Sequence, residues 1–363
     1  FFFKQKTAYE IPKRDWSSDV CSSDLGAPIV LGREVIAGGV LRAVVVNSKV
    51  SNVATGAPGV ANARRMAAAA AKEIGSDASK VLVSSTGVIG VPLPIEKVEA
   101  GIVGMAAELQ SDPMVGARGI MTTDTHPKAF SAKVGDATIT WIAKGAGMIE
   151  PNMATMLAYV FTDAKLDAAA LDGMLRRAVD VSFNMCSVDT DTSTSDTCAI
   201  LANGLAGAVD AVAFEAALTT GCIRMAETIA RDGEGANHLI RVRVRGAKDT
   251  AEAKVIAKSV VNSPLVKTMV AGADPNVGRL LMAIGKCFTA TIDRGSTECW
   301  INGHHVVTKG TRAAFEDADV RGALGGEVVE IAITLGVGAG EAMAFGCDLT
   351  HGYIDENAAY YSS

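Results

Sequence analysis

Short runs of β-branched and apolar residues alternate along this chain with longer, alanine-rich segments of helical spacing. The short runs predict strands at 41–47, 81–84, 137–143 and 156–162. The longer segments predict helices at 61–74, 95–109, 166–184, 211–231 and 250–261. Residues 238–245 alternate apolar and basic side chains, which predicts a half-exposed or edge strand. This alternation is typical of the α/β class, with mixed rather than purely parallel sheets.

The length and the charge of the chain limit what it can be. Its 363 residues allow two domains, and a composition break near 246–249 predicts a larger domain, 26–246, followed by a smaller one, 247–363. The net charge of −6 argues against nucleic acid or an anionic membrane surface as the main partner. No apolar run approaches the roughly 18 residues that indicate a membrane-spanning helix, so we expect no membrane partner.

The pattern of potential metal ligands predicts no metal site. The seven cysteines are scattered without CxxC spacing, which indicates a reducing compartment, no disulfide framework and no zinc site. We expect most of the cysteines to be small buried residues. A calcium loop starting at Asp189 does not fit, because its sixth and twelfth positions hold Thr194 and Ile200 instead of Gly and Glu.

The first 25 residues differ from the rest of the chain. Five aromatic residues crowd into them, and neither helical nor strand periodicity is present. Charges such as Lys4 and Lys6 leave no apolar core for a signal peptide. The segment resembles translated sequencing-adapter sequence joined to a truncated gene, and a genuine leader is the alternative. On either interpretation we expect it to be disordered and foreign to the fold.

The segment 144–155, KGAGMIEPNMAT, carries the most specific chemistry. Gly145 and Gly147 allow a tightly folded loop, and Thr155 opens the next predicted strand. A threonine held there could attack the preceding carbonyl group, so that hydrolysis of the resulting ester leaves Thr155 as a new N-terminus. Its hydroxyl would then be a nucleophile with its own α-amino group, of pKa about 8, as the base. Without further context, a β-branched strand residue is the simpler interpretation of Thr155.

From about residue 26 onward the chain resembles the ornithine acetyltransferase (glutamate N-acetyltransferase) family of arginine biosynthesis. The motifs that carry the resemblance are 85–90 (STGVIG), 122–128 (TTDTHPK), 144–157 (KGAGMIEPNMATML), 191–194 (DTST), 262–268 (NSPLVKT), 272–276 (GADPN), 346–350 (GCDLT) and 357–358 (NA). They follow in the family order over nearly the whole chain. The resemblance implies an α-β-β-α sandwich core built on mixed sheets, with a smaller C-terminal α/β domain.

The family resemblance also assigns the chemistry to residues. It implies self-cleavage between Ala154 and Thr155, after which Thr155 carries an acetyl group from N2-acetylornithine to glutamate in a ping-pong cycle. Thr86 and Gly87 would form the oxyanion hole. The substrate would be bound by Thr122, Lys144, Thr155, Glu234, Asn357 and Ser362. Without this context, Lys144 and Glu234 would be ordinary surface charges, and Asn357 and Ser362 a frayed terminus.

The resemblance further implies a cytoplasmic enzyme that needs no metal or organic cofactor. Its two fragments would stay associated, as a heterotetramer of two α and two β chains. Whether acetyl-CoA is accepted as a second donor stays open. So do two alternatives, a related self-cleaving aminopeptidase or amidase, and an inactive truncated member. Lys49 occupies a position where the family has glycine, and would strain the turn if its φ is positive.

Overall fold

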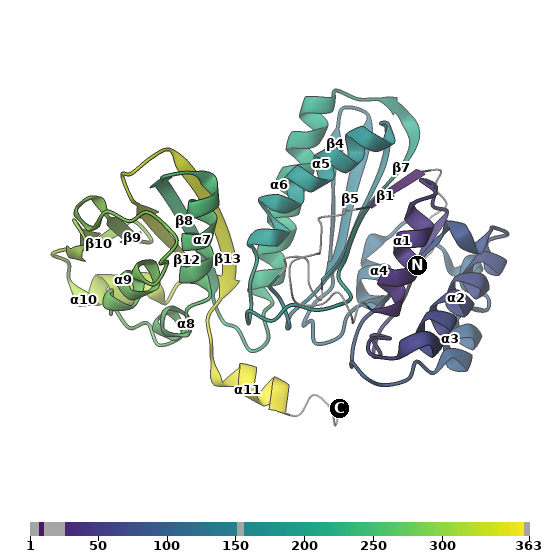
Figure 1. The fold of residues 1–363 in the computed structure, drawn as a ribbon, viewed down its shortest axis with the longest axis horizontal. Coiled ribbons are helices and arrows are strands. Elements are labelled where there is room, and N and C mark those ends of the chain that lie inside the picture. The colour runs from purple at the N-terminus through teal and green to yellow at the C-terminus, as the bar shows by residue number, and fades with distance from the viewer. Residues whose placement is uncertain (1–6, 11–25, 151–155, 359–363) are drawn as a thin grey trace. The chain divides into compact units, whose positions relative to one another are not determined.

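The computed structural model describes residues 7–10, 26–150 and 156–358, with the backbone alone at 7–10. The chain divides into two compact units (Figure 1). Unit 1 comprises Phe1–Gly145, Pro151–Asp180 and Thr192–Met225, and unit 2 comprises Ala146–Glu150, Val181–Asp191 and Ala226–Ser363. The division therefore differs from the predicted boundary at 246/247. The strand Leu239–Ala247 crosses the predicted boundary and pairs with a strand of unit 2. Unit 2 therefore already includes the chain before residue 246.

Unit 1 is built on a five-stranded mixed sheet of order β1-β7-β6-β5-β4. Its strands are β1 (Thr7–Glu10), β4 (Lys128–Val134), β5 (Ala137–Lys144), β6 (Leu157–Lys165) and β7 (Thr197–Ala208). Neighbouring strands are antiparallel except for β6 and β7, which run parallel. The predicted strands at 137–143 and 156–162 are confirmed as β5 and β6.

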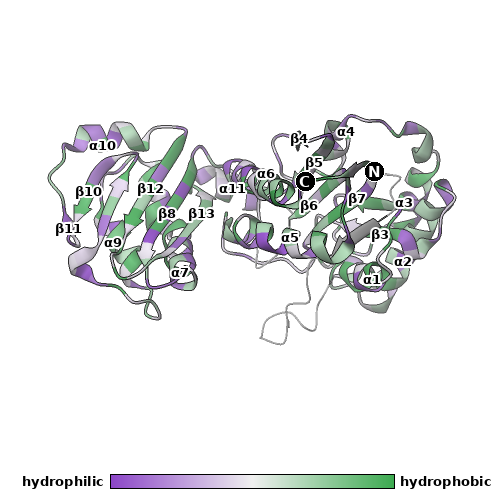
Figure 2. Ribbon diagram, turned by 90° about the horizontal axis from the view of Figure 1, so that it is seen from above, coloured by the Kyte–Doolittle hydropathy of each residue, from purple (hydrophilic) through white to green (hydrophobic). Residues whose placement is uncertain are grey.

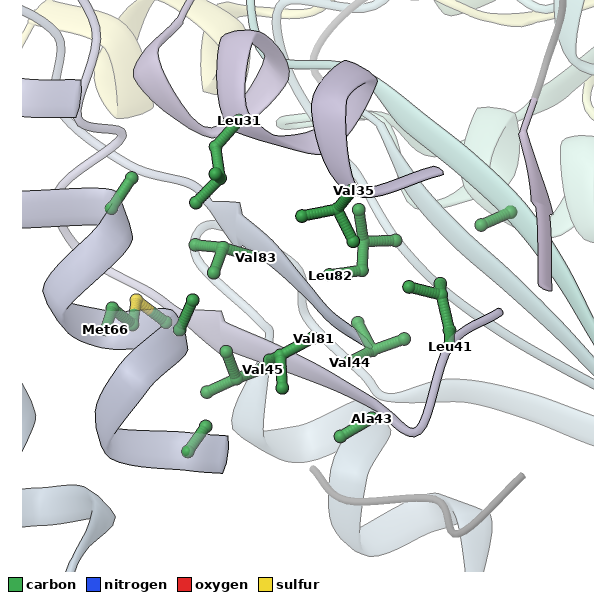
Figure 3. Packing of buried hydrophobic residues seen from close by; sticks show 14 of the residues in the cluster. Leu31, Val35, Leu41, Ala43, Val44, Val45, Met66, Val81, Leu82 and Val83 are labelled. Atoms are coloured by element: carbon green, nitrogen blue, oxygen red, sulfur yellow. The ribbon is translucent and has the colours of Figure 1, made fainter. Parts of the chain in front are cut away.

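A second layer of unit 1 packs on this sheet. The parallel strands β2 (Ala43–Asn47) and β3 (Val81–Ser85) form a two-stranded sheet. Apolar side chains from both sheets and from the covering helices meet in one buried core, part of which is shown in Figure 3. The helices on this side are α1 (Ala27–Ile36), α2 (Gly56–Glu73), α3 (Ile95–Ile102) and α4 (Pro113–Gly119).

The opposite face of the five-stranded sheet is covered by α5 (Ala168–Asp180) and α6 (Ala211–Arg231) (Figure 1). A Cβ at Gly221 of α6 would lie 2.1 Å from the Trp141 ring of β5, so this helix can lie against the tryptophan only with glycine at that position. Helices therefore flank two stacked sheets, and the predicted α-β-β-α sandwich is confirmed.

Unit 2 is built on a six-stranded mixed sheet of order β11-β10-β9-β12-β8-β13. Its strands are β8 (Leu239–Ala247), β9 (Glu298–Ile301), β10 (His304–Thr308), β11 (Thr311–Arg312), β12 (Val328–Thr334) and β13 (Gly340–Cys347). Its helices are α7 (Thr250–Val261), α8 (Pro264–Ala271), α9 (Gly278–Gly285), α10 (Asp317–Leu324) and α11 (His351–Ala358). Of the segments expected to be helical, 250–261 belongs wholly to this unit and is confirmed as α7.

Strand β8 is half-exposed, as its alternating sequence predicts, and hydrophilic and hydrophobic residues alternate along it (Figure 2). The expectation that it could be an edge strand is wrong, because β8 pairs with β12 on one side and β13 on the other. Its open face carries arginines that are matched by acidic neighbours. Arg241 Nε lies 2.6 Å from Glu227 Oε1, and Arg243 Nε lies 3.6 Å from Glu330 Oε1.

Residues Thr7–Glu10 form strand β1, although disorder was expected there. β1 pairs antiparallel with β7, from Thr7 opposite Ala202 to Glu10 opposite Ala199. An edge strand exposes unpaired N–H and C=O groups that an extended segment can satisfy whatever its side chains. The rest of the predicted leader lies outside the described residues.

The six cysteines within the described residues are all buried, which confirms the expectation for them. Within the described parts of the chain, no helix combines the length and apolar character needed to cross a bilayer.

Candidate active site

Two hydrogen-bond donors that follow β3 in unit 1 are without a partner among the residues that the structure describes. Thr86 is buried, and its hydroxyl has no hydrogen-bond partner among the described residues. The N–H of Gly87 makes no backbone hydrogen bond to any residue that the structure describes. Gly87 has φ +127°, and a Cβ there would lie 2.2 Å from the carbonyl carbon of Lys49. Adjacent free hydroxyl and N–H donors are the elements of an oxyanion hole.

Asn47, the last residue of β2, holds this turn in place. Thr86 N–H donates to the Asn47 carbonyl oxygen at 3.0 Å, and Ser85 Oγ donates to Asn47 Oδ1 at 2.6 Å. Val88 N–H donates to the Lys49 carbonyl oxygen at 3.0 Å. Lys49 has φ +84°, a left-handed conformation that is strained for a residue with a side chain, as the sequence predicts for a positive φ at this position. The strained residue therefore lies directly against Gly87.

Asp124 organises a buried charged cluster in unit 1. Lys128 Nζ lies 2.7 Å from Asp124 Oδ1, and the exposed fractions of the two side chains are 0% and 1%. Gly145 N–H donates to Asp124 Oδ1 at 2.7 Å, and Thr122 N–H donates to Oδ2 at 3.1 Å. Burial alone would raise the pKa of Asp124, but the charges of Lys128 and Lys144 and these hydrogen bonds lower it below its ordinary value. The cluster thus brings two predicted substrate residues, Thr122 and Lys144, to one carboxylate.

Lys144 ends β5 beside the start of β6. It is buried and stands opposite Leu157 in the antiparallel register of the two strands. On the other side, Leu157 pairs with Thr197 of β7. Lys144 is therefore fixed opposite the residue that follows Thr155 by two positions in the sequence. The predicted scissile residues Ala154 and Thr155, and the predicted substrate residue Ser362, lie outside the described residues.

Two other predicted substrate residues meet in unit 2. Glu234 is buried, and Asn357 Nδ2 donates to its Oε2 atom at 2.7 Å across 123 positions of sequence. Glu234 N–H donates to the Ala146 carbonyl oxygen at 3.0 Å. A Cβ at Gly147 would lie 2.2 Å from the Glu234 carboxyl carbon, so only glycine lets the loop approach this carboxylate. The structure therefore brings together two of the residues that the family resemblance assigns to substrate binding.

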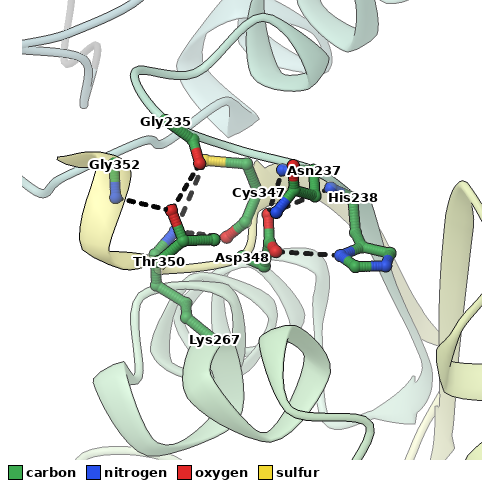
Figure 4. A network of polar contacts seen from close by, with 8 residues as sticks. All are labelled: Gly235, Asn237, His238, Lys267, Cys347, Asp348, Thr350 and Gly352. Atoms are coloured by element: carbon green, nitrogen blue, oxygen red, sulfur yellow. Dashed lines mark hydrogen bonds and ion pairs between the residues drawn. The ribbon is translucent and has the colours of Figure 1, made fainter.

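Polar contacts hold the chain before and at the start of α11 against the residues that follow Glu234 (Figure 4). Thr350 Oγ1 donates to the Gly235 carbonyl oxygen at 2.5 Å and accepts from Gly352 N–H at 3.0 Å. Asp348 accepts from Asn237 N–H at 2.8 Å and from His238 N–H at 3.0 Å. Residues 348–352, at the start of α11, are therefore hydrogen-bonded to residues 235–238, which directly follow Glu234.

Asp189 holds the neighbouring loop of unit 2. It accepts the N–H of Met148 at 2.6 Å and that of Ile149 at 2.8 Å. Tyr353 of α11 donates its hydroxyl to the same carboxylate at 3.3 Å. Burial raises the pKa of Asp189 in spite of these backbone donors. In the sequence, Asp189 stands out only as the start of an incomplete calcium loop. Within the described residues, no group of three or more His, Cys, Asp or Glu side chains is arranged to hold a metal.

Comparisons with known proteins identify the family of the chain. The model of the ArgJ family matches residues 21–362. The chain belongs to the ArgJ family. It is 47% identical over 343 residues to the glutamate N-acetyltransferase Oat2 of Streptomyces clavuligerus, covering 92% of this chain and 87% of that one. It is also 47% identical over 338 residues to the arginine biosynthesis bifunctional protein ArgJ 2 of Clostridium acetobutylicum, with the same coverage.

A solved structure supports the fold as well. The crystal structure of the arginine biosynthesis bifunctional protein ArgJ from Bacillus halodurans matches with a TM-score of 0.55 and 37% sequence identity. The match covers 57% of this chain and all of that chain. Membership of the ArgJ family makes the chain an acetyltransferase of arginine biosynthesis, and it confirms the family resemblance carried by the motifs.

Sequence reasoning missed three carboxylates that accept backbone N–H groups of the motif 144–157, namely Asp124 and Asp196 in unit 1 and Asp189 in unit 2. Asp124 lies inside the quoted motif 122–128, but its role depends on burial and on backbone donors that are not adjacent in sequence. Asp196 accepts Met156 N–H at 2.5 Å, directly after the predicted nucleophile. The only signal in the sequence was their position within or beside family motifs.

Proposed function

We propose that this chain is a glutamate N-acetyltransferase that moves an acetyl group from N2-acetylornithine to glutamate. It would mature by self-cleavage between Ala154 and Thr155, and the freed Thr155 would carry the acetyl group as an ester on Oγ. The observation that carries this proposal is a pair of donors, the Thr86 hydroxyl and the Gly87 N–H, for which the described part of the chain supplies no partner. They are suited to the negative oxygen that develops when a hydroxyl attacks an amide carbonyl group.

The chemistry follows a two-step cycle. In the first step Thr155 Oγ loses its proton to the α-amino group of the same residue and attacks the acetyl carbonyl carbon. The C–N bond then breaks, ornithine leaves with the proton, and the acetyl ester remains. In the second step the α-amino group of glutamate attacks the ester and regenerates the hydroxyl. One oxyanion donor in such a site contributes about 10²–10³ in rate.

Charged groups support recognition of an amino-acid substrate. Lys144 can bind an α-carboxylate as a point charge. Glu234 can pair with the terminal ammonium group of ornithine, and Asn357 orients its carboxylate through the contact of 2.7 Å. A hydrolase whose acceptor is water would not need an amino-acid binding site for the second substrate.

Two measurements test the proposal. Intact mass under denaturing conditions should give two fragments, residues 1–154 and 155–363, whose masses sum to 37.4 kDa plus one water. The Thr155→Ala variant should stay intact. A single intact species in the wild-type chain would contradict the proposed maturation and favour an inactive member.

The second measurement separates transfer from hydrolysis. The matured protein is supplied with N2-acetylornithine, with and without glutamate, and ornithine release is followed. Release that depends on glutamate supports the transferase, whereas equal rates in both reactions would favour the amidase alternative. Repeating the assay with acetyl-CoA as donor tests the second activity, and native mass spectrometry tests the proposed heterotetramer of two α and two β fragments.

A further inference from the structure

The carboxylate of Glu234 lies against a loop of unit 2 whose conformation is strained. Gly147 stands directly at this carboxylate, since a Cβ there would lie 2.2 Å from its carboxyl carbon. The next residue, Met148, has φ +52°, a left-handed conformation that a residue with a side chain rarely adopts. Such a conformation persists only where neighbouring contacts hold it. The approach of the loop to Glu234 therefore depends on the contacts that hold Met148.

The carboxylate of Asp189 supplies those contacts. Its Oδ2 atom accepts the N–H of Met148 at 2.6 Å, and its Oδ1 atom accepts the N–H of Ile149 at 2.8 Å. The backbone adds a bond nearby, because Glu150 N–H donates to the Asp191 carbonyl oxygen at 3.0 Å. The two bonds to Asp189 are made by a side chain, and one of them reaches the strained residue itself. A substitution of Asp189 therefore acts directly on the loop.

Asp189 also holds the other side of Glu234. Tyr353 of α11 donates its hydroxyl to Asp189 Oδ2 at 3.3 Å, and Asn357 Nδ2 donates to Glu234 Oε2 at 2.7 Å. Residues four positions apart lie on the same face of a helix, so both contacts come from one face of α11. The same Nδ2 atom of Asn357 donates to the Tyr353 carbonyl oxygen at 2.9 Å. Because α11 has no buried side chains, polar contacts of this kind determine its position.

We infer that Asp189 is a positioning residue for the substrate-binding carboxylate of Glu234. One carboxylate fixes the loop that contains Gly147 and the helix that contains Asn357, and Glu234 contacts both. The inference rests on the proposed function, in which Glu234 pairs with the terminal ammonium group of ornithine. It assigns Asp189 to the recognition of that group, acting through Glu234 and not on the substrate.

The test compares two acetyl donors that differ only in the group that Glu234 would bind. N2-acetylornithine carries the terminal ammonium group, whereas N-acetylnorvaline has the same carbon chain without it. Formation of N-acetylglutamate is followed for both donors, and the ratio of their kcat/KM values measures selectivity for the ammonium group. Both values are taken on one preparation, so their ratio does not depend on the fraction of the chain that has matured. A general loss of structure would lower both values and leave the ratio unchanged.

Four variants divide the contacts of the carboxylate. Asp189→Asn keeps the shape of the side chain but loses one acceptor oxygen and the negative charge, and Tyr353→Phe removes only the bond to α11. Asp191→Asn is the matched control, because it removes the same charge two residues away, while Asp191 contacts the loop through its backbone carbonyl oxygen. Glu234→Gln gives the ratio expected when the substrate-binding carboxylate is lost altogether.

We expect the wild-type chain to prefer N2-acetylornithine and Asp189→Asn to lower this preference about tenfold, the loss expected for one hydrogen bond to a charged group. Tyr353→Phe should lower it by a smaller factor, and Asp191→Asn should keep the wild-type ratio. If Asp189→Asn does not fold or mature, the ratio measured for Tyr353→Phe decides.

An unchanged ratio in Asp189→Asn, or an equal fall in Asp191→Asn, would overturn the inference and leave the proposed function standing. A wild-type chain that uses both donors equally well would overturn the role of Glu234 and the inference with it. A wild-type chain that forms no N-acetylglutamate from N2-acetylornithine would overturn the proposed function itself.

Discussion

Replacing Asp124 by Asn tests the electrostatic organisation of unit 1 with almost no change of shape. The carboxylate is shared by Lys128, at 2.7 Å, and by the charge of Lys144, and the side chains of Asp124 and Lys128 are almost fully buried. Asn leaves both cations buried without the anion that they share. Removing one partner of a buried ion pair typically costs about 3–5 kcal/mol, so we expect Asp124→Asn to lower the free energy of unfolding by about that amount.

The exposed pair between Arg64 and Glu34 provides the control. Its two atoms also lie 2.7 Å apart, but the side chains are 53% and 51% exposed. Exposed pairs contribute about 0–1 kcal/mol, so Glu34→Gln should change stability by no more than that. Urea unfolding is followed by fluorescence in a Trp16→Phe/Trp300→Phe background, which leaves Trp141 of unit 1 as the one tryptophan of the chain.

A double variant sharpens the test. Lys128→Met in the Asp124→Asn background removes one of the two buried cations, so it should recover part of the lost stability. The pH dependence has a defined sign, since the pKa of Asp124 is lowered on folding. Its stabilisation is complete above the unfolded value of about 3.9 and is lost as pH falls through the folded value. If Asp124→Asn costs no more than Glu34→Gln, the cluster does not depend on this carboxylate and the reasoning is wrong.

Three further predictions concern backbone and thiol groups. Lys49→Gly should stabilise the protein by up to about 1 kcal/mol, because φ +84° is strained for lysine but not for glycine, and a thermal melt checks this. Gly235→Ala should raise the KM for N2-acetylornithine, because a Cβ at φ +67° would lie 2.3 Å from Gly352 and Tyr353 and would displace α11, and steady-state kinetics show whether it does. Burial raises the pKa of Cys186, Cys222 and Cys299 to about 12, so these thiols should react with Ellman's reagent only after unfolding, which a comparison of native and denatured protein measures.

The strongly periodic segments of the sequence were predictable. The alanine-rich helix at 61–74, the strand at 81–84 and the helix at 250–261 all form close to the expected bounds. The helix expected over 95–109 ends at Ile102 instead, because Gly104 adopts φ +84° and interrupts it. Strand β7 was missed because Asn203, Gly204 and Gly207 break the apolar pattern, although its pairing with β6 stabilises it.

The site could be predicted only where a motif carried it. The resemblance placed Glu234 and Asn357 in one site, and in the structure their side chains meet. No local pattern predicts α11 itself, which has no buried side chains and is held by Thr350 and Gly352 against Gly235. Such contacts depend on tertiary structure, which a single sequence does not display.

The two carboxyl groups beside Lys144 show what the fold adds to residue type. Asp124 receives two backbone N–H donors and the Lys128 ammonium, so its ionised form is favoured. Asp196 is buried with one N–H donor, and burial raises its pKa well above the ordinary value in spite of that donor, so its neutral form is favoured. Counted alone, these two carboxyl groups and two lysines then carry one excess positive charge. An excess positive charge at Lys144 is what a site needs to bind the α-carboxylate of an amino acid, and ionisation of Asp196 as well as Asp124 would cancel it.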